Sequence, residues 1–221
     1  MPTADSLAPP APGLRVRKRE RTRRSITDAA FALFAERGFD AVRLTEIAAA
    51  ADVAPATVFT HFGSKEEIFF NRRAEFDEHL PEAVADAANG AELVSGLREF
   101  YGSSVRLALA DEWIGPARTF ARILLASPAL RRSYLSLVRE RQDLLIAALY
   151  DRAPGGADTA ELALFAGFVA AVAGTAFESL HAGLASDEPA ERIRQSVDEA
   201  LDRGFARLAR AYPGDTVLDR R

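Results

Sequence analysis

The chain has no cysteine and only three histidines among its 221 residues. Without cysteine it can form neither a disulfide nor a cysteine-ligated zinc site. His61, His79 and His181 lie far apart in the sequence and do not have the spacing of metal ligands. No phosphate-binding loop, pair of carboxylates or nucleophile with its base stands out either. The sequence therefore predicts no catalytic residues, no metal site and no cofactor, and we expect a protein that is not an enzyme.

Long apolar runs are also scarce. The N-terminus has prolines and a basic run but no apolar core segment, so it does not have the pattern of a secretory signal. Residues 162–177, LALFAGFVAAVAGTAF, are apolar on all sides, but they are fewer than the roughly 20 residues of a spanning helix. Acidic residues flank this stretch at Glu161 and Glu178. We expect a buried helix, no membrane partner and a cytoplasmic protein.

Helical periodicity is what the chain has in abundance. Strand-like alternation, hairpin signals and internal repeats do not appear, so we expect an all-α fold. Apolar residues at the i, i+3, i+4, i+7 spacing predict a short helix over residues 44–51. A break follows at Asp52, and Pro55 suits the first position of a second helix over residues 55–62 because it needs no N–H partner there. Two short helices joined by a sharp turn form a helix-turn-helix.

The second of these helices divides by face. Val58 and Phe62 point inward, whereas Thr57 and His61 share another face with hydroxyl and imidazole groups. A third surface is mostly uncharged and small enough to enter a DNA groove; it consists of Pro55, Ala56, Phe59 and Thr60.

A third helix is predicted to begin at Lys65. Ser64 and Glu67 have the spacing of a capping box, in which the serine caps the helix and the glutamate reaches back. A lysine in the first turn opposes the positive end of the helix dipole unless an anion, such as a DNA phosphate, lies nearby. The alternative is a solvated surface lysine.

These motifs resemble the TetR-type one-component transcriptional regulators, and the resemblance covers the family's DNA-binding domain. It implies a three-helix N-terminal DNA-binding domain followed by a C-terminal helical bundle for effector binding and dimerisation, with about nine helices in total. By the same resemblance, Thr57, His61 and Lys65 contact phosphates. The residues expected nearest the base edges are Thr45, Pro55, Ala56, Phe59 and Thr60. The matching positions are Ile26, Ala29, Ala30, Leu33, Phe34, residues 36–39, residues 44–48, Val53, residues 57–62 and residues 64–66.

Four positions depart from the family pattern. Arg43 replaces a capping threonine and is expected to contact phosphate instead. Asp52 replaces a turn glycine, which is plausible because aspartate tolerates the left-handed region. Ala54 replaces a capping serine. Phe59 replaces a tyrosine, which leaves an apolar contact such as one with a thymine methyl group. The operator sequence therefore does not follow from relatives.

Charge is divided unevenly along the chain. Residues 1–65 carry ten Lys/Arg and seven Asp/Glu, a net +3; the rest carries eighteen and twenty-five, a net −7, which recovers the total of −4. The basic residues are densest from Arg15 to Arg24, where they are expected to reach phosphates, the alternative being a solvated tail. We divide the chain into a disordered basic arm (1–18), a DNA-binding domain (19–66), an effector-binding and dimerisation domain (67–212) and a flexible tail (213–221).

In the C-terminal domain, a helix over residues 65–87 contains Pro81, which predicts a kink or a break. The family resemblance implies an apolar effector pocket, for which we select six aromatic residues, although core packing is the alternative for each. Four arginines are candidates to contact an anionic group of the effector, such as a carboxylate. The alternative is that they form surface salt bridges. The aromatic residues are Tyr101, Trp113, Phe120, Tyr134, Phe165 and Phe168; the arginines are Arg106, Arg118, Arg122 and Arg141.

The last helix, over residues 190–211, has one narrow apolar stripe, and the resemblance implies a homodimer through the last two helices; intramolecular packing is the alternative. The expected function is a repressor that a small, largely apolar effector releases from a palindromic double-stranded DNA operator. The rival hypothesis is a DNA-organising protein that has no effector site and no sequence preference.

Overall fold

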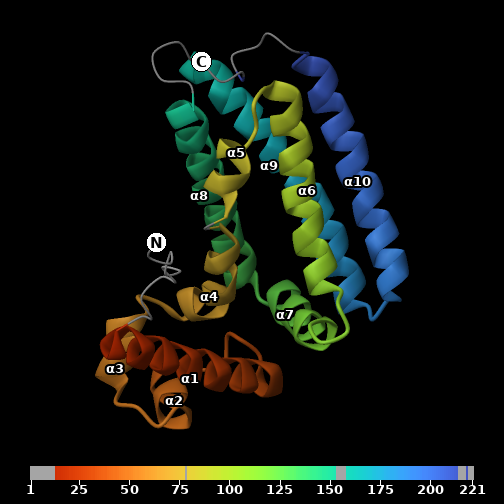
Figure 1. The fold of residues 1–221 in the computed structure, drawn as a ribbon. Helices are drawn as coiled ribbons and strands as arrows, with labels where there is room; N and C mark the ends of the chain where they lie inside the picture. The colour runs from red at the N-terminus through yellow and green to blue at the C-terminus, as the bar shows by residue number, and fades with distance from the viewer. Residues whose placement is uncertain (1–12, 78, 153–157, 214–217, 219–221) are drawn as a thin grey trace, which may run out of the picture. The chain divides into compact units, whose positions relative to one another are not determined.

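The computed structural model of the chain describes residues 13–77, 79–152, 158–213 and 218. All regular secondary structure in these residues is α-helical, in ten helices, as expected for an all-α protein (Figure 1). The contacts divide the chain into two compact units. The first comprises Met1–Arg37 and Ala41–Phe69, and the second comprises Gly38–Asp40 and Phe70–Arg221.

The first unit contains α1 (Leu14–Arg37), α2 (Leu44–Ala50), α3 (Pro55–His61) and the start of α4 (Lys65–Asp77). Residues 14–18, which we assigned to a disordered arm, are the first turns of α1. Stacking of Phe31 on Phe69, with ring centroids 5.3 Å apart, joins α1 to α4. The core consists of apolar side chains from all four helices: Ile26, Ala30, Phe34, Ile47, Ala48, Val58, Phe62 and Phe69.

The turn between α2 and α3 is built around Asp52. Its φ of 54° lies in the left-handed region that the sequence requires there. Val53 N–H donates to the Ala48 carbonyl at 3.0 Å and Asp52 N–H to the Ala49 carbonyl at 3.2 Å, which together form a Schellman motif. Pro55 then occupies the first turn of α3. The turn is therefore closed by backbone bonds, and Asp52 adopts the left-handed conformation that glycine most readily adopts.

The second unit contains the remaining helices around a core centred on α9. Its helices are α5 (Leu80–Ala85), α6 (Gly90–Ala108), α7 (Ile114–Ala126), α8 (Pro128–Arg152), α9 (Thr159–Ala185) and α10 (Ala190–Ala211). Helix α9 packs against α7, α8 and α10, and α10 also packs against α6. The region of Pro81 is a break and not a kink, because α4 ends at Asp77 and α5 begins at Leu80. This break raises the number of helices above the expected nine.

Helix α9 is longer than the apolar run that predicted it. It has 27 residues and is long and apolar enough to cross a membrane by length and composition. Such evidence is weak, because the core helix of a folded domain passes the same test. In this structure, one side of α9 is buried by its three neighbouring helices, with Phe165, Val169 and Leu180 at most 3% exposed.

The apolar stripe of α10 packs inside its own chain. Its residues Ile193, Val197, Leu201, Phe205 and Leu208 are all at most 4% exposed. Gly204 allows close approach to α9, since a Cβ there would lie 2.4 Å from a methyl carbon of Val172. The stripe that we considered for a subunit interface is therefore occupied by intramolecular contacts.

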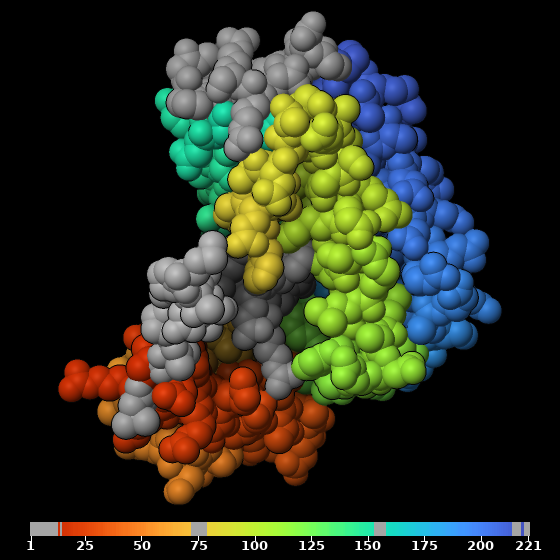
Figure 2. Space-filling view, in the orientation of Figure 1, coloured from red at the N-terminus to blue at the C-terminus, as the bar shows by residue number. Residues whose placement is uncertain are grey.

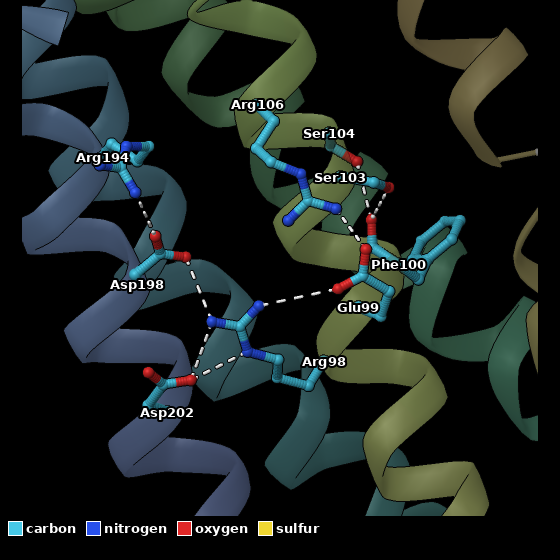
Figure 3. A network of polar contacts seen from close by, with 9 residues as sticks. All are labelled: Arg98, Glu99, Phe100, Ser103, Ser104, Arg106, Arg194, Asp198 and Asp202. Atoms are coloured by element: carbon cyan, nitrogen blue, oxygen red, sulfur yellow. Dashed lines mark hydrogen bonds and ion pairs between the residues drawn. The ribbon is translucent and has the colours of Figure 1, made fainter. Parts of the chain in front are cut away.

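Ion pairs join α6 to α10 at the surface. Figure 2 shows these two helices side by side on one face. Arg98 donates to Asp202 at 2.9 Å and to Asp198 at 3.2 Å, and Arg194 also faces Asp198 (Figure 3). Pairs this exposed contribute at most about 1 kcal/mol each. Their main effect is to favour one register between the two helices.

Arg152, at the end of α8, has a structural role that its charge does not suggest. Its guanidinium is buried and donates to the carbonyls of Val84 at 2.9 Å and Ala87 at 2.6 Å, around the end of α5, where carbonyls lack helical partners. It also donates to the Leu218 carbonyl at 3.1 Å. Leu218 belongs to the segment that we expected to be a flexible tail, yet its side chain is only 1% exposed.

Candidate nucleic-acid interface

The outward face of α3 presents mostly carbon atoms. Pro55, Ala56, Phe59 and Thr60 are all exposed, and Phe59 is 58% exposed. On the opposite side Val58 is fully buried. The helix is therefore divided by face as the sequence predicts, because the inward side chains of Val58 and Phe62 complete the core of the first unit.

The polar flank of α3 consists of Thr57 and His61, which are both partly exposed. Burial lowers the pKa of His61 below its ordinary value, and the positive charges of Arg19 and Arg23 lower it further. The imidazole is thus neutral at pH 7 and donates one N–H group. This environment favours a neutral hydrogen bond over an ion pair for a phosphate contact by His61.

Arg23 fastens the C-terminal end of α3 to α1. Its guanidinium donates to the His61 carbonyl at 2.5 Å and lies 4.2 Å from the centre of the Phe62 ring. The bond satisfies a carbonyl at the end of a helix, and a cation there is favoured by the helix dipole. We expected Arg23 among the phosphate contacts. Arg23 and His61 are 38 positions apart in the sequence, so no local pattern indicates that Arg23 binds the end of α3, and sequence reasoning missed this role.

Lys65 lies at the start of α4 and is partly exposed. Its Nζ donates to the Val42 carbonyl at 2.8 Å, just before α2 begins. An ammonium group carries three N–H donors, so this bond is compatible with a phosphate contact. The capping box is present in a slightly shifted form: Ser64 Oγ accepts from Glu67 N–H at 3.0 Å, while Glu67 accepts from Gly63 N–H at 2.6 Å.

The start of α2 is held by Glu46. Its carboxylate accepts from Arg43 N–H at 2.8 Å and from the Arg37 guanidinium at 2.8 Å. The backbone bond from Arg43 and then the bond from Arg37 lower the pKa of Glu46 below its ordinary value. The side chains of Arg43 and Thr45 are exposed.

The first turns of α1 add a dense positive surface to this unit. The exposed cations are Arg15, Arg17, Lys18, Arg19, Arg21 and Arg24. Basic side chains in this density attract a phosphate backbone without reading its sequence. The unit therefore combines an uncharged helix face, suited to a groove, with a basic surface, suited to phosphates.

Comparison with known proteins identifies this arrangement. Residues 26–71 match the family model described as bacterial regulatory proteins, tetR family. The N-terminal unit belongs to the TetR family. This TetR-family unit also resembles the HTH-type transcriptional regulator TcmR of Streptomyces glaucescens, with 41% identity over 70 residues. That match covers 32% of this chain and 31% of TcmR, so the chain matches only about a third of the relative's length.

Solved structures extend the similarity in fold to the body of the chain. SmeT, the repressor of a multidrug efflux pump of Stenotrophomonas maltophilia, is 24% identical with a TM-score of 0.56, covering 84% of this chain and 89% of SmeT. NalD, a secondary repressor of an efflux pump in Pseudomonas aeruginosa, is 22% identical with a TM-score of 0.52, covering 85% and 96%. At these identities the comparison shows a TetR-like fold.

The body of this TetR-like chain contains a small cavity between α6, α8 and α9. Tyr101 and Tyr134, two of the six aromatic residues that we selected, contribute to its wall. The space is about 10 Å³, enough for about one water molecule. The other wall residues are Val138, Arg141, Gln142, Leu145, Ala166, Val169, Ala170, Ala173, Gly174 and Phe177.

The other four selected aromatic residues lie outside this wall. Phe165 is fully buried against Tyr212, with ring centroids 5.1 Å apart. Trp113 and Phe168 are 43% and 50% exposed. Phe120 lies 5.9 Å from the ring of His181.

His181 is the centre of an aromatic cluster next to this cavity. It is 5% exposed, and its ring lies 5.7 Å from Tyr134 and 6.2 Å from Phe177, which both line the cavity. Sequence reasoning missed Phe177 because it ends a uniformly apolar stretch whose inward face has no sequence signal, and it missed His181 because a single histidine on a helix does not show what it packs against. In the described part of the chain, no three His, Asp or Glu side chains are grouped as metal ligands.

The four arginines considered for an anion have different environments. Arg118 and Arg122 donate to Asp187 at 2.9 and 3.3 Å, and Arg106 pairs with Glu99, as surface ion pairs. Arg141 differs because it is 7% exposed and lines the cavity.

Proposed function

We propose that this chain is a transcriptional repressor that binds a palindromic double-stranded DNA operator as a homodimer in the cytoplasm and leaves it when a small molecule binds the body. The observation that carries the proposal is the uncharged, exposed face of α3 on a unit whose flanks are basic. An α-helix fits the major groove, and the basic flanks supply phosphate contacts. We assign Thr57, His61, Lys65 and Arg43 to phosphates, and Thr45 together with the α3 face to the base edges.

The effector site is proposed at the cavity beside His181. Because the space holds about one water molecule, a ligand has to separate α8 from α9, which costs free energy that its contacts must offset. The α9 side of the cavity includes Ala166, Ala170 and Gly174, whose small size would let a ring pack closely against α9 once the helices separate. The similar fold of SmeT was solved as a complex with triclosan, which supports a small, largely apolar ligand. Such a ligand releases DNA to the extent that it prefers the DNA-incompetent state.

The homodimer is proposed through α9 with support from α10. Leu164 and Phe168 of α9 are 55% and 50% exposed and lie four residues apart, on one face of the helix. Large apolar side chains exposed in this way are typical of an interface. Because the apolar stripe of α10 is buried in its own subunit, α10 would contribute mainly polar side chains together with the exposed alanines Ala206 and Ala209.

Footprinting of the purified protein on the DNA upstream of its own gene tests the proposal. We expect two protected half-sites related by a dyad, and affinity for random DNA that is at least about a thousandfold weaker. Equal affinity for random DNA would support the rival hypothesis of a DNA-organising protein. Screening small apolar compounds by thermal shift, followed by the footprint in their presence, tests release.

A further inference from the structure

The exposed ring of Phe59 is unusual among the phenylalanines of the first unit. Phe34, Phe62 and Phe69 are at most 2% exposed, whereas Phe59 is 58% exposed at the centre of the α3 face. Leaving an aromatic ring in water forgoes the free energy that its burial would contribute. The ring is therefore better explained by a surface that covers it when the protein acts.

The hydrogen-bonding capacity of this face limits what it can read. Pro55, Ala56 and Phe59 carry no polar side-chain atoms, and the hydroxyl of Thr60 donates to the Ala56 carbonyl at 2.9 Å. Thr60 Oγ1 keeps only acceptor capacity. Guanine presents two acceptors in the major groove and needs N–H donors, which this face lacks. Cytosine and adenine both present an amino donor to the Thr60 acceptor, so the feature that this face can distinguish is the thymine methyl group, which a phenylalanine ring can contact.

We propose that Phe59 contacts a thymine methyl group in each half-site of the operator and makes this chain selective for thymine there. The inference rests on the proposed function and adds a specificity-determining residue to it. The basic turns of α1 in the same unit match the charge of DNA, which identifies the surface that covers the ring. Arg23 holds the end of α3 through the His61 carbonyl, so the ring is presented on a fixed helix.

The test replaces thymine by deoxyuridine, one position at a time, in the operator found by footprinting. This change removes one methyl group and leaves the hydrogen-bonding edge unaltered. A buried methyl is worth about 0.8 kcal/mol, so the affinity should fall about fourfold per half-site and about fifteenfold when both half-sites are changed. Measurements of Kd by fluorescence anisotropy with both DNAs are sufficient.

The assignment to Phe59 is tested by the Phe59→Ala variant. This side chain is outside the core, so the variant should fold, which a circular dichroism melt verifies. We expect it to bind the thymine and deoxyuridine operators equally. Leu135→Ala is a matched control, because Leu135 is 69% exposed on α8 in the second unit and should preserve the preference for thymine.

Two outcomes would overturn the inference. In the first, no replacement of thymine by deoxyuridine weakens binding. In the second, the replacement lowers the affinity of Phe59→Ala as much as that of the unchanged protein. Either outcome leaves the proposed function intact as long as the footprint shows specific half-sites. Absence of specific DNA binding would instead refute the proposed function itself.

Discussion

The assignment of Lys65 and His61 to phosphates predicts different salt dependences for their variants. Lys65 carries a formal positive charge, whereas burial and the charges of Arg19 and Arg23 lower the pKa of His61 and favour its neutral form. Each cation that neutralises a phosphate contributes about 0.9 to the slope of log K against log salt concentration. A neutral donor contributes nothing to this slope.

The informative substitutions are Lys65→Gln and His61→Gln. Glutamine at position 65 keeps an N–H donor for the Val42 carbonyl, to which Lys65 donates at 2.8 Å, so the fold is perturbed little. For a dimer on a palindrome, Lys65→Gln should reduce the slope by about 1.8. The ratio of the variant's Kd to that of the unchanged protein should then shrink about twelvefold between 50 and 200 mM salt.

For His61→Gln at pH 7.5 we expect an unchanged slope and little change in affinity, because glutamine replaces one neutral N–H donor with another. Fluorescence anisotropy titrations at four salt concentrations measure both quantities. The reasoning is refuted if Lys65→Gln leaves the slope unaltered, or if His61→Gln flattens it as much as the lysine variant does.

Three further predictions concern the body of the protein. Phe168→Glu should abolish the dimer, so light scattering should give the 23.9 kDa of one chain; a persistent dimer would exclude α9 as the interface. Arg152→Met should lower the free energy of unfolding in urea by about 2–4 kcal/mol, because three buried carbonyls lose their donor, and a loss below about 0.5 kcal/mol would contradict this. Burial, and then the hydrogen bond to Glu161, raise the pKa of Tyr212 to about 12, above its value near 10 when unfolded. The stabilising contribution of the Tyr212 hydroxyl is therefore present below pH 10 and lost as the pH rises to 12. Urea unfolding should show that the difference in free energy of unfolding between the unchanged protein and Tyr212→Phe narrows by about 2 kcal/mol from pH 10 to pH 12. A difference that stays constant over this window would refute the prediction.

The elements that sequence reasoning located well are those with local causes. Pro55 begins α3 because its ring presets φ, and Ser64 caps α4 through a bond to a backbone three residues away. Asp52 adopts the left-handed conformation because the Schellman bonds involve only its near neighbours. Such signals lie within five or six residues and are visible in any fold.

The features that sequence reasoning could not locate depend on distant partners. Trp113 and Phe165 are both large aromatic residues. Trp113, in the turn before α7, is 43% exposed, whereas Phe165 of α9 is fully buried and packs against Tyr212 at the end of α10. The charge of a side chain also did not predict its exposure: Arg152 and Arg141 are buried, although arginine is normally a surface residue. For the stripe of α10, periodicity showed that it is buried but not whether its partner belongs to the same chain.

The intramolecular packing of α10 has a consequence for how the protein responds to its own abundance. The apolar stripe of α10 is buried by α6 and α9 of its own chain, so we infer that its burial does not depend on pairing. If pairing is weak, subunits are mostly single at low expression, and occupancy of a two-half-site operator rises with the square of protein concentration. A dilution series of the operator titration would then show a sigmoidal curve, and the proposed repression would acquire a threshold in protein concentration that the helix-turn-helix alone does not provide.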